Sequence, residues 1–318
     1  MADRRRIALA GMAATLIDAA WLRAGETAIS VGVGDGADIL SVDTELQTGD
    51  AQRPLPVRII APRQGGSLPI LAFSHGAYSS GRHYDRILRA WAAAGFVVLA
   101  PTHRDSVSLG VVRGSHNSRY FAWRLDDMAL LFASFDEIGR RVPDLRRRMD
   151  RQRIAATGHS FGGLVAQTIS GATFSDAEAT STRHGALRGI QATVIFSGAG
   201  RMEALVGDAD LAALRTPLLV TVGSEDLRQV PGLTGYQWRR EPFDLAGSHD
   251  RYLLTLQGSD HYLGGLVGRD DLPIAAAAQS WLATFNRVTL WFLARYLLGR
   301  SQPLPDVAPN LLESRLGN

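Results

Sequence analysis

The chain between residues 153 and 163 reads RIAATGHSFGG, and this stretch decides the fold. Residues 154–157 form a short apolar run with an arginine before it and a glycine after it, which is typical of a buried strand. The residues that follow the glycines are typical of the start of a helix. A strand, a sharp turn and a helix therefore surround Ser160. Gly158 and Gly162 stand where a larger side chain would collide with the strand or the helix.

Gly-x-Ser-x-Gly in a strand–turn–helix setting is typical of the nucleophile elbow of an α/β-hydrolase. The five-residue pattern is weak evidence by itself, because a chain with 33 glycines contains such patterns by chance at an appreciable rate. The interpretation therefore depends on the rest of the sequence. It has to supply a base, an acid and donors for an oxyanion, in the right order along the chain.

Other apolar runs alternate with helical segments and predict an α/β-hydrolase fold. The alternation implies a mostly parallel central sheet with helices on both faces, opened by an antiparallel pair of strands. No long insertion follows residues 192–196, so we expect no large lid. The predicted strands are residues 39–46, 56–62, 68–73, 96–100, 154–157, 192–196, 218–222 and 252–256, and the predicted helices are residues 84–94, 121–139, 161–170 and 273–298.

Composition excludes several classes of protein. The chain is 46% apolar and 20% charged, as in ordinary globular proteins, and we expect one domain over residues 29–318. All 34 basic residues are arginines and they are dispersed, so no nucleic-acid partner is expected. The absence of cysteine excludes disulfides, thiolate nucleophiles and Cys-ligated metals. With no His-x-x-x-His pair and no phosphate-binding glycine loop, we expect neither metal nor cofactor. We also expect no membrane span, and a monomer or a homodimer.

The first 28 residues form a separate segment with two interpretations. Three arginines at residues 4–6 precede an apolar run to residue 17, which resembles a signal peptide ending near residue 24. Asp18 interrupts this run and favours an amphipathic helix instead. The helix implies a cytoplasmic protein, and the signal peptide a periplasmic or secreted one.

The proposed nucleophile, Ser160, needs a base within hydrogen-bond reach, because a serine hydroxyl is unreactive at neutral pH. In α/β-hydrolases the catalytic residues follow the order Ser, Asp or Glu, then His. His261 comes directly after the strand at residues 252–256, at the carboxyl edge of the sheet, where ligands of such sheets bind. His249 precedes that strand and His184 comes too early in the chain. We therefore predict that His261 is the base.

The acid is expected after the preceding strand, at residues 218–222. Asp226 and its neighbour Glu225 both follow it, and Asp226 is the preferred candidate to orient the imidazole and stabilise its charged form. Asp260, which adjoins the predicted base, is expected to cap its loop instead.

An oxyanion hole requires one backbone N–H after the nucleophile and one from the loop after an earlier strand. Phe161 and Ala77 are the predicted donors. The residues expected to line the pocket, from their position beside these groups, are His75, Tyr78, His159, Tyr262 and Leu263. Among them, the two histidines are expected to orient or pack rather than to act as bases.

Several motifs together resemble one protein family, the bacterial α/β-hydrolases related to platelet-activating-factor acetylhydrolase, with chlorophyllases and dienelactone hydrolases more distant. The resemblance covers residues 38 to 299. It implies a Ser-Asp-His esterase without a cofactor, with oxyanion donors at Ala77 and Phe161. The motifs are LPVR at 55–58, FSHG at 73–76, Trp91 with GFVV at 95–98, APTHRDS at 100–106, GHSFGG at 158–163 and GSDH at 258–261.

The chain departs from these relatives at the nucleophile. Dienelactone hydrolases use a cysteine, which this chain lacks, and chlorophyllases carry a different residue after the serine. In cutinases, which degrade polyesters, a methionine usually stands where this chain has Phe161, and a terminal disulfide is present.

The sequence predicts a serine carboxylic-ester hydrolase that forms an acyl-enzyme on short-chain or otherwise small esters. Amide hydrolysis, acyl transfer, perhydrolysis and polyester hydrolysis use the same triad and remain alternatives. A non-catalytic binding protein on this fold would show a broken triad.

Overall fold

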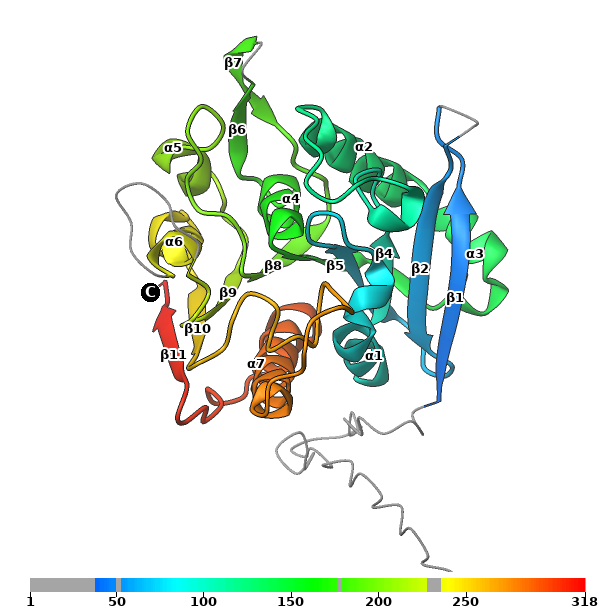
Figure 1. The fold of residues 1–318 in the computed structure, drawn as a ribbon. Helices are drawn as coiled ribbons and strands as arrows, with labels where there is room; N and C mark the ends of the chain where they lie inside the picture. Colours follow the sequence, from blue (N-terminus) through cyan, green and yellow to red (C-terminus); the bar gives the residue numbers. More distant parts are fainter. Residues whose placement is uncertain (1–37, 50–52, 177–178, 228–235, 318) are drawn as a thin grey trace, which may run out of the picture.

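The computed structural model describes residues 38–49, 53–176, 179–227 and 236–317, and a nine-stranded sheet lies at its centre (Figure 1). The N-terminal segment, residues 1–28, lies outside the described residues. The order across the sheet is β1-β2-β4-β3-β5-β8-β9-β10-β11. Its strands are β1 (Ile39–Leu46), β2 (Leu55–Pro62), β3 (Leu68–Ser74), β4 (Val97–Pro101), β5 (Met149–His159), β8 (Ile190–Phe196), β9 (Leu218–Gly223), β10 (Arg251–Leu256) and β11 (Leu311–Arg315).

The six central strands, from β4 to β10, run parallel to one another. β1 pairs antiparallel with β2, and β2 antiparallel with β4, so the predicted antiparallel opening of a mostly parallel sheet is confirmed. The last strand, β11, pairs antiparallel with β10 and was not predicted. All parallel strands therefore end at the same edge of the sheet.

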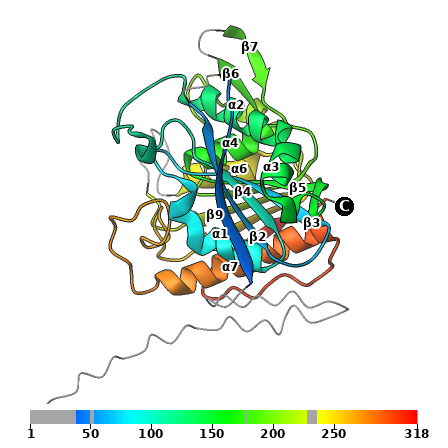
Figure 2. The same cartoon turned by 90° about the vertical axis from the view of Figure 1, so that its right-hand side faces the viewer.

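Helices cover both faces of the sheet, as predicted (Figure 1, Figure 2). Side chains alternate between the faces along each strand. In β3, Leu71 and Phe73 pack in the cluster with α1 and α7, whereas Ile70 and Ala72 pack with α2, α3 and α4. The helices are α1 (Asp85–Ala93), α2 (Tyr120–Ala133), α3 (Phe135–Arg141), α4 (Phe161–Ile169), α5 (Asp208–Ala212), α6 (Gln237–Leu245) and α7 (Ala278–Leu298), with short 3-10 turns at Gly81–Tyr84, Val107–Leu109 and Pro143–Leu145. Within the described ranges, no helix has the length and apolar character needed to span a bilayer.

The structure differs from the sequence prediction in a few elements. The single helix expected over residues 121–139 is broken at Ser134 into α2 and α3. A separate hairpin, β6 (Thr173–Asp176) with β7 (Ala179–His184), extends from the sheet after α4. Its strands are largely polar and lack apolar alternation, so no strand signal was present. The short α5 and the proline-containing α6 were missed for the same kind of reason.

Close backbone packing explains the glycines of the elbow. A Cβ on Gly162 would lie 1.9 Å from the carbonyl oxygen of Ser74 and 2.6 Å from that of His75. A Cβ on Gly158 would lie 2.1 Å from the carbonyl oxygen of Gly162. Side chains at these positions would therefore force β3, β5 and α4 apart.

We predict that Gly162→Ala strongly destabilises the protein, because its methyl group would meet two backbone carbonyls that cannot rotate away. The expected loss in the free energy of unfolding is at least about 3 kcal/mol, the range of severe core overpacking. Gly66→Ala is the matched control, since nothing lies within 4 Å of its Cβ position. Urea unfolding of the two variants measures the effect, and equal midpoints would contradict the prediction.

Candidate active site

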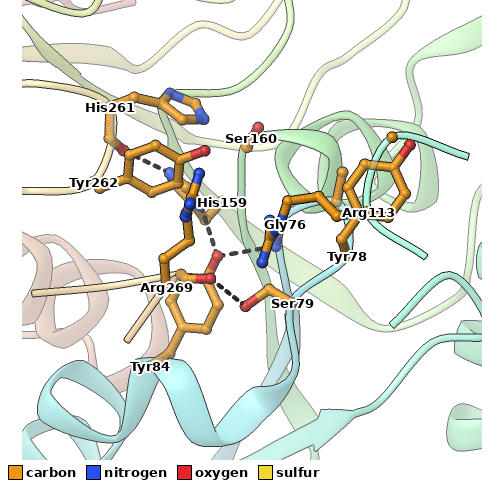
Figure 3. Close-up of a pocket in the computed structure, with 13 residues that line it drawn as sticks. Gly76, Tyr78, Ser79, Tyr84, Arg113, His159, Ser160, His261, Tyr262 and Arg269 are labelled. Atoms are coloured by element: carbon orange, nitrogen blue, oxygen red, sulfur yellow. Dashed lines mark hydrogen bonds between the residues drawn. The ribbon is translucent and has the colours of Figure 1, made fainter. Parts of the chain in front are cut away.

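Four loops converge at the carboxyl edge of the parallel strands. Ala77 follows β3, Ser160 follows β5, Asp226 follows β9 and His261 follows β10. Ser160 and His261 line one open cavity of about 270 Å³ together with Ala77. Figure 3 shows the serine and the histidine on the same side of this cavity. The order of strands in the sheet thus brings together residues that are up to 184 positions apart in the sequence (261 minus 77).

The backbone at Ser160 is strained. Its φ of 54° and ψ of −119° lie outside the regions that a non-glycine residue ordinarily occupies. The turn leaves the side chain partly exposed at the cavity, directly before the first residue of α4, Phe161. N–H groups in the first turn of a helix have no intrahelical acceptor, so the Phe161 N–H is available to a ligand. The Ala77 N–H, too, has no acceptor among the described residues.

His261 and Asp226 form a hydrogen-bonded pair. Nδ1 of His261 lies 2.8 Å from Oδ2 of Asp226, which is buried, whereas Glu225 is exposed. Since Nδ1 donates to the carboxylate, Nε2 is the nitrogen that can accept a proton. Oδ1 of Asp260 accepts the N–H groups of Tyr262 (3.0 Å) and Gly264 (2.7 Å) and so caps this loop, as the sequence predicted.

Arg239, on α6, contacts the same carboxylate and was not found from the sequence. Its Nε lies 3.0 Å from Oδ2 of Asp226, and its Nη1 donates to the carbonyl oxygen of Ser197 at 2.6 Å. Burial opposes the charge of Asp226, but the hydrogen bond to His261 and the charges of His261 and Arg239 prevail and lower its pKa to about 2. No sequence signal marked Arg239, because α6 itself was not predicted.

The environment of His261, the predicted base, favours its neutral form. Burial lowers the pKa of His261 below its ordinary value, and the positive charge of Arg239 acts in the same direction, against the raising effect of Asp226. His261 is therefore neutral at pH 7 and able to accept a proton.

His159 supports the loop that carries His261. Its Nε2 lies 2.8 Å from the carbonyl oxygen of His261, and its Nδ1 lies 2.7 Å from the hydroxyl of Tyr84. Burial lowers the pKa of His159 well below its ordinary value, so the ring is neutral, donating through Nε2 and accepting at Nδ1. Such a histidine orients its neighbour and is not itself positioned as a base.

The structure places the five residues of the predicted pocket in two different environments. Tyr78, His159 and Tyr262 line the cavity. His75 and Leu263 are fully buried and are not among the residues that line it. Adjacency in sequence did not reveal this, because the chain turns both side chains inward.

Two arginines that sequence reasoning missed also line the cavity (Figure 3). Arg113 comes from the loop between β4 and α2. Arg269 pairs with Asp271, and its guanidinium lies 5.8 Å from the ring centre of Tyr262. Over the described ranges, no three His, Asp or Glu side chains converge as they would around a metal ion.

A strained serine at a strand-to-helix turn, on a sheet of this order, defines the protein as an α/β-hydrolase. Residues 35–193, half of the chain, match the model of the Chlorophyllase family, and the chain belongs to that family. The matched part contains Ser160 and Ala77 and ends before Asp226 and His261. Chlorophyllases are among the relatives that the sequence motifs resemble.

The fold is similar to that of dienelactone hydrolase from Anabaena variabilis, with a TM-score of 0.54 and 17% sequence identity, over 82% of this chain and 99% of the other. At this identity the similarity establishes the fold alone. No curated protein sequence matches the chain significantly. Fold and family together identify a hydrolase of the esterase-like kind.

We predict an acid limb in the pH profile of the hydrolytic activity, with a midpoint below 6.5. The reason is that protonated His261 cannot act as a base, so activity is lost as the pH falls through its lowered pKa. The substitution Arg239→Gln removes a positive charge that lowers the pKa of His261, so the midpoint should move to higher pH.

The control for this prediction is Arg240→Gln, on the same helix, because Arg240 pairs with Asp244 and Glu313 and not with Asp226. The measurement is kcat/KM from pH 4 to 9 for the three proteins. A midpoint that stays in place, or moves down, in Arg239→Gln would show that its charge does not act on the base.

Proposed function

We propose that the protein is a serine carboxylic-ester hydrolase that acts through Ser160, His261 and Asp226 on small esters. One observation carries the proposal: a histidine held by a buried carboxylate at 2.8 Å lines the same cavity as a serine in a strained elbow. The membership in a hydrolase family supports the same conclusion.

In the proposed acylation, Oγ of Ser160 attacks the ester carbonyl carbon while Nε2 of His261 takes the hydroxyl proton. The electron pair of the carbonyl moves onto its oxygen, which the N–H groups of Ala77 and Phe161 stabilise. When the tetrahedral intermediate collapses, the C–O bond to the alcohol breaks and His261 returns the proton to the departing oxygen. Asp226 stabilises the imidazolium during both steps.

Deacylation repeats these steps with water as the nucleophile and releases the acid. Three features support small substrates. The cavity of about 270 Å³ is below the usual size of pockets for drug-sized ligands. Between β8 and β9 the chain forms only the five-residue helix α5, so no lid domain follows β8. The side chains of Arg113 and Arg269 line the same cavity and take up part of its space.

We expect the wild-type protein to hydrolyse p-nitrophenyl acetate and butyrate faster than the palmitate, because a long acyl chain exceeds the cavity. Ser160→Ala should lose about 10³-fold or more in kcat, since the covalent route depends on its hydroxyl. The measurement is the release of p-nitrophenol across the series. Hydrolysis of ethyl butyrate and of chlorophyll a, two esters without an activated leaving group, is measured separately from the acid or alcohol released.

Labelling with a fluorophosphonate provides a second readout that is independent of the ester chosen. It should modify the wild type at Ser160 and leave Ser160→Ala unmodified. Full activity in Ser160→Ala would remove the elbow from the mechanism. Absence of both labelling and ester turnover in the wild type would overturn the proposed function.

A further inference from the structure

The oxyanion donor Ala77 N–H belongs to the same planar peptide group as the Gly76 carbonyl. In a trans peptide the N–H and the C=O point in opposite directions, so whatever holds the carbonyl also aims the donor. Three donors converge on the Gly76 oxygen: Nδ1 of His75 at 2.7 Å, Nη2 of Arg124 at 3.1 Å and the N–H of Ser79 at 3.2 Å. The carbonyl is thereby held toward the interior and the N–H on the opposite side.

Arg124, which α2 carries into the interior, and its partner Asp105 also hold the peptide groups on either side. Arg124 is 1% exposed, and its Nη1 donates to the carbonyl oxygen of His75 at 2.5 Å. Its Nε and Nη2 bind the two oxygens of Asp105 at 2.9 and 2.8 Å. Oδ2 of Asp105 in turn accepts the N–H of Tyr78 at 3.3 Å. One buried ion pair therefore spans the three consecutive peptide groups around the donor.

The same guanidinium reaches the second oxyanion residue. Its central carbon lies 4.5 Å from the ring centre of Phe161, the residue that supplies the other N–H. Arg124 therefore contacts the backbone on one side of the oxyanion hole and a side chain on the other.

Among the described residues, Asp105 is the carboxylate that forms an ion pair with this guanidinium. Burial lowers the pKa of His75 and of His103 well below their ordinary values, and both rings are neutral. The N–H of His103 donates to Nε2 of His75 at 2.9 Å, so His75 carries its proton on Nδ1 and donates it to Gly76. Asp105 stays ionised, because the charge of Arg124 outweighs its burial and holds the pKa of that carboxyl well below its usual range.

We propose that Arg124 and Asp105 are positioning residues that aim and polarise the oxyanion hole; this inference rests on the proposed esterase mechanism. A charge-assisted hydrogen bond to a carbonyl draws electron density from the whole peptide group and makes its N–H a stronger donor. Because the pair is buried and satisfied before substrate arrives, the Ala77 N–H needs no reorganisation when the oxyanion forms.

The test is the double variant Arg124→Gln/Asp105→Asn, which removes both charges together and so avoids leaving one of them buried and unpaired. We expect kcat for p-nitrophenyl butyrate to fall by about 10²-fold while KM changes by less than about threefold, since only the transition state carries the oxyanion. The affinity for a trifluoromethyl ketone, whose adduct with Ser160 places an oxyanion in the hole, should fall by a similar factor. Binding of the corresponding methyl ketone should not change.

Arg153→Gln/Asp150→Asn is the matched control, because it makes the same two substitutions in an ion pair at the start of β5, at the far end of the strand from Ser160. It should retain the wild-type kcat. Arg124→Lys keeps the charge but loses the forked geometry of the guanidinium. We expect this variant, too, to have a lower kcat and an unchanged KM. If the double variant does not fold, Arg124→Lys is used in its place for the same measurements. Thermal unfolding shows which of the variants are folded.

Three results would overturn the inference. The first is a folded Arg124 variant with kcat within about threefold of the wild type. The second is a loss of kcat with unchanged trifluoromethyl ketone affinity, which would indicate a purely structural role. The third is a wild type that hydrolyses no ester, which overturns the proposed function as well, whereas the first two overturn this inference alone.

Discussion

The start of α4 packs against the last residues of β3 at backbone contact distance, and the geometry of the site depends on this packing. Only a glycine at position 162 permits it. The contact places the loop that carries Ala77 beside the strained turn at Ser160, so the proposed nucleophile and the proposed oxyanion donors follow two strands that pair directly. Asp226 and His261 follow strands further across the sheet and reach the same edge because those strands are parallel to β5.

Beneath the site, polar groups are buried where an ordinary core would be apolar. Burying them is costly unless each one finds a partner, and around Arg124 the partners are main-chain carbonyls and a carboxylate. Loops are usually the mobile part of such a fold. Here the backbone of the loop after β3 is hydrogen-bonded at successive residues to one buried cluster, and these bonds restrict its motion.

The sequence was sufficient for the fold, because the central strands are unbroken apolar runs and their alternation with helices leaves few arrangements. The residue order expected of an α/β-hydrolase pointed to Asp226 and His261, and their loops meet in the structure. Two residues near the site gave no signal in the sequence. Arg124 and Arg239 lie on the inward faces of helices and are buried. Patterns of hydrophobicity assign a charged side chain to the surface, so only the folded contacts reveal these residues.

All basic residues of this chain are arginines, and this has a consequence for the conditions under which the enzyme can work. A lysine in the interior tends to lose its proton and its charge, whereas a guanidinium keeps both even when buried. The supports of Gly76 and Asp226 are therefore permanent charges, indifferent to the acidity of the surroundings. Alkaline conditions that would discharge a buried lysine therefore leave these two supports unchanged.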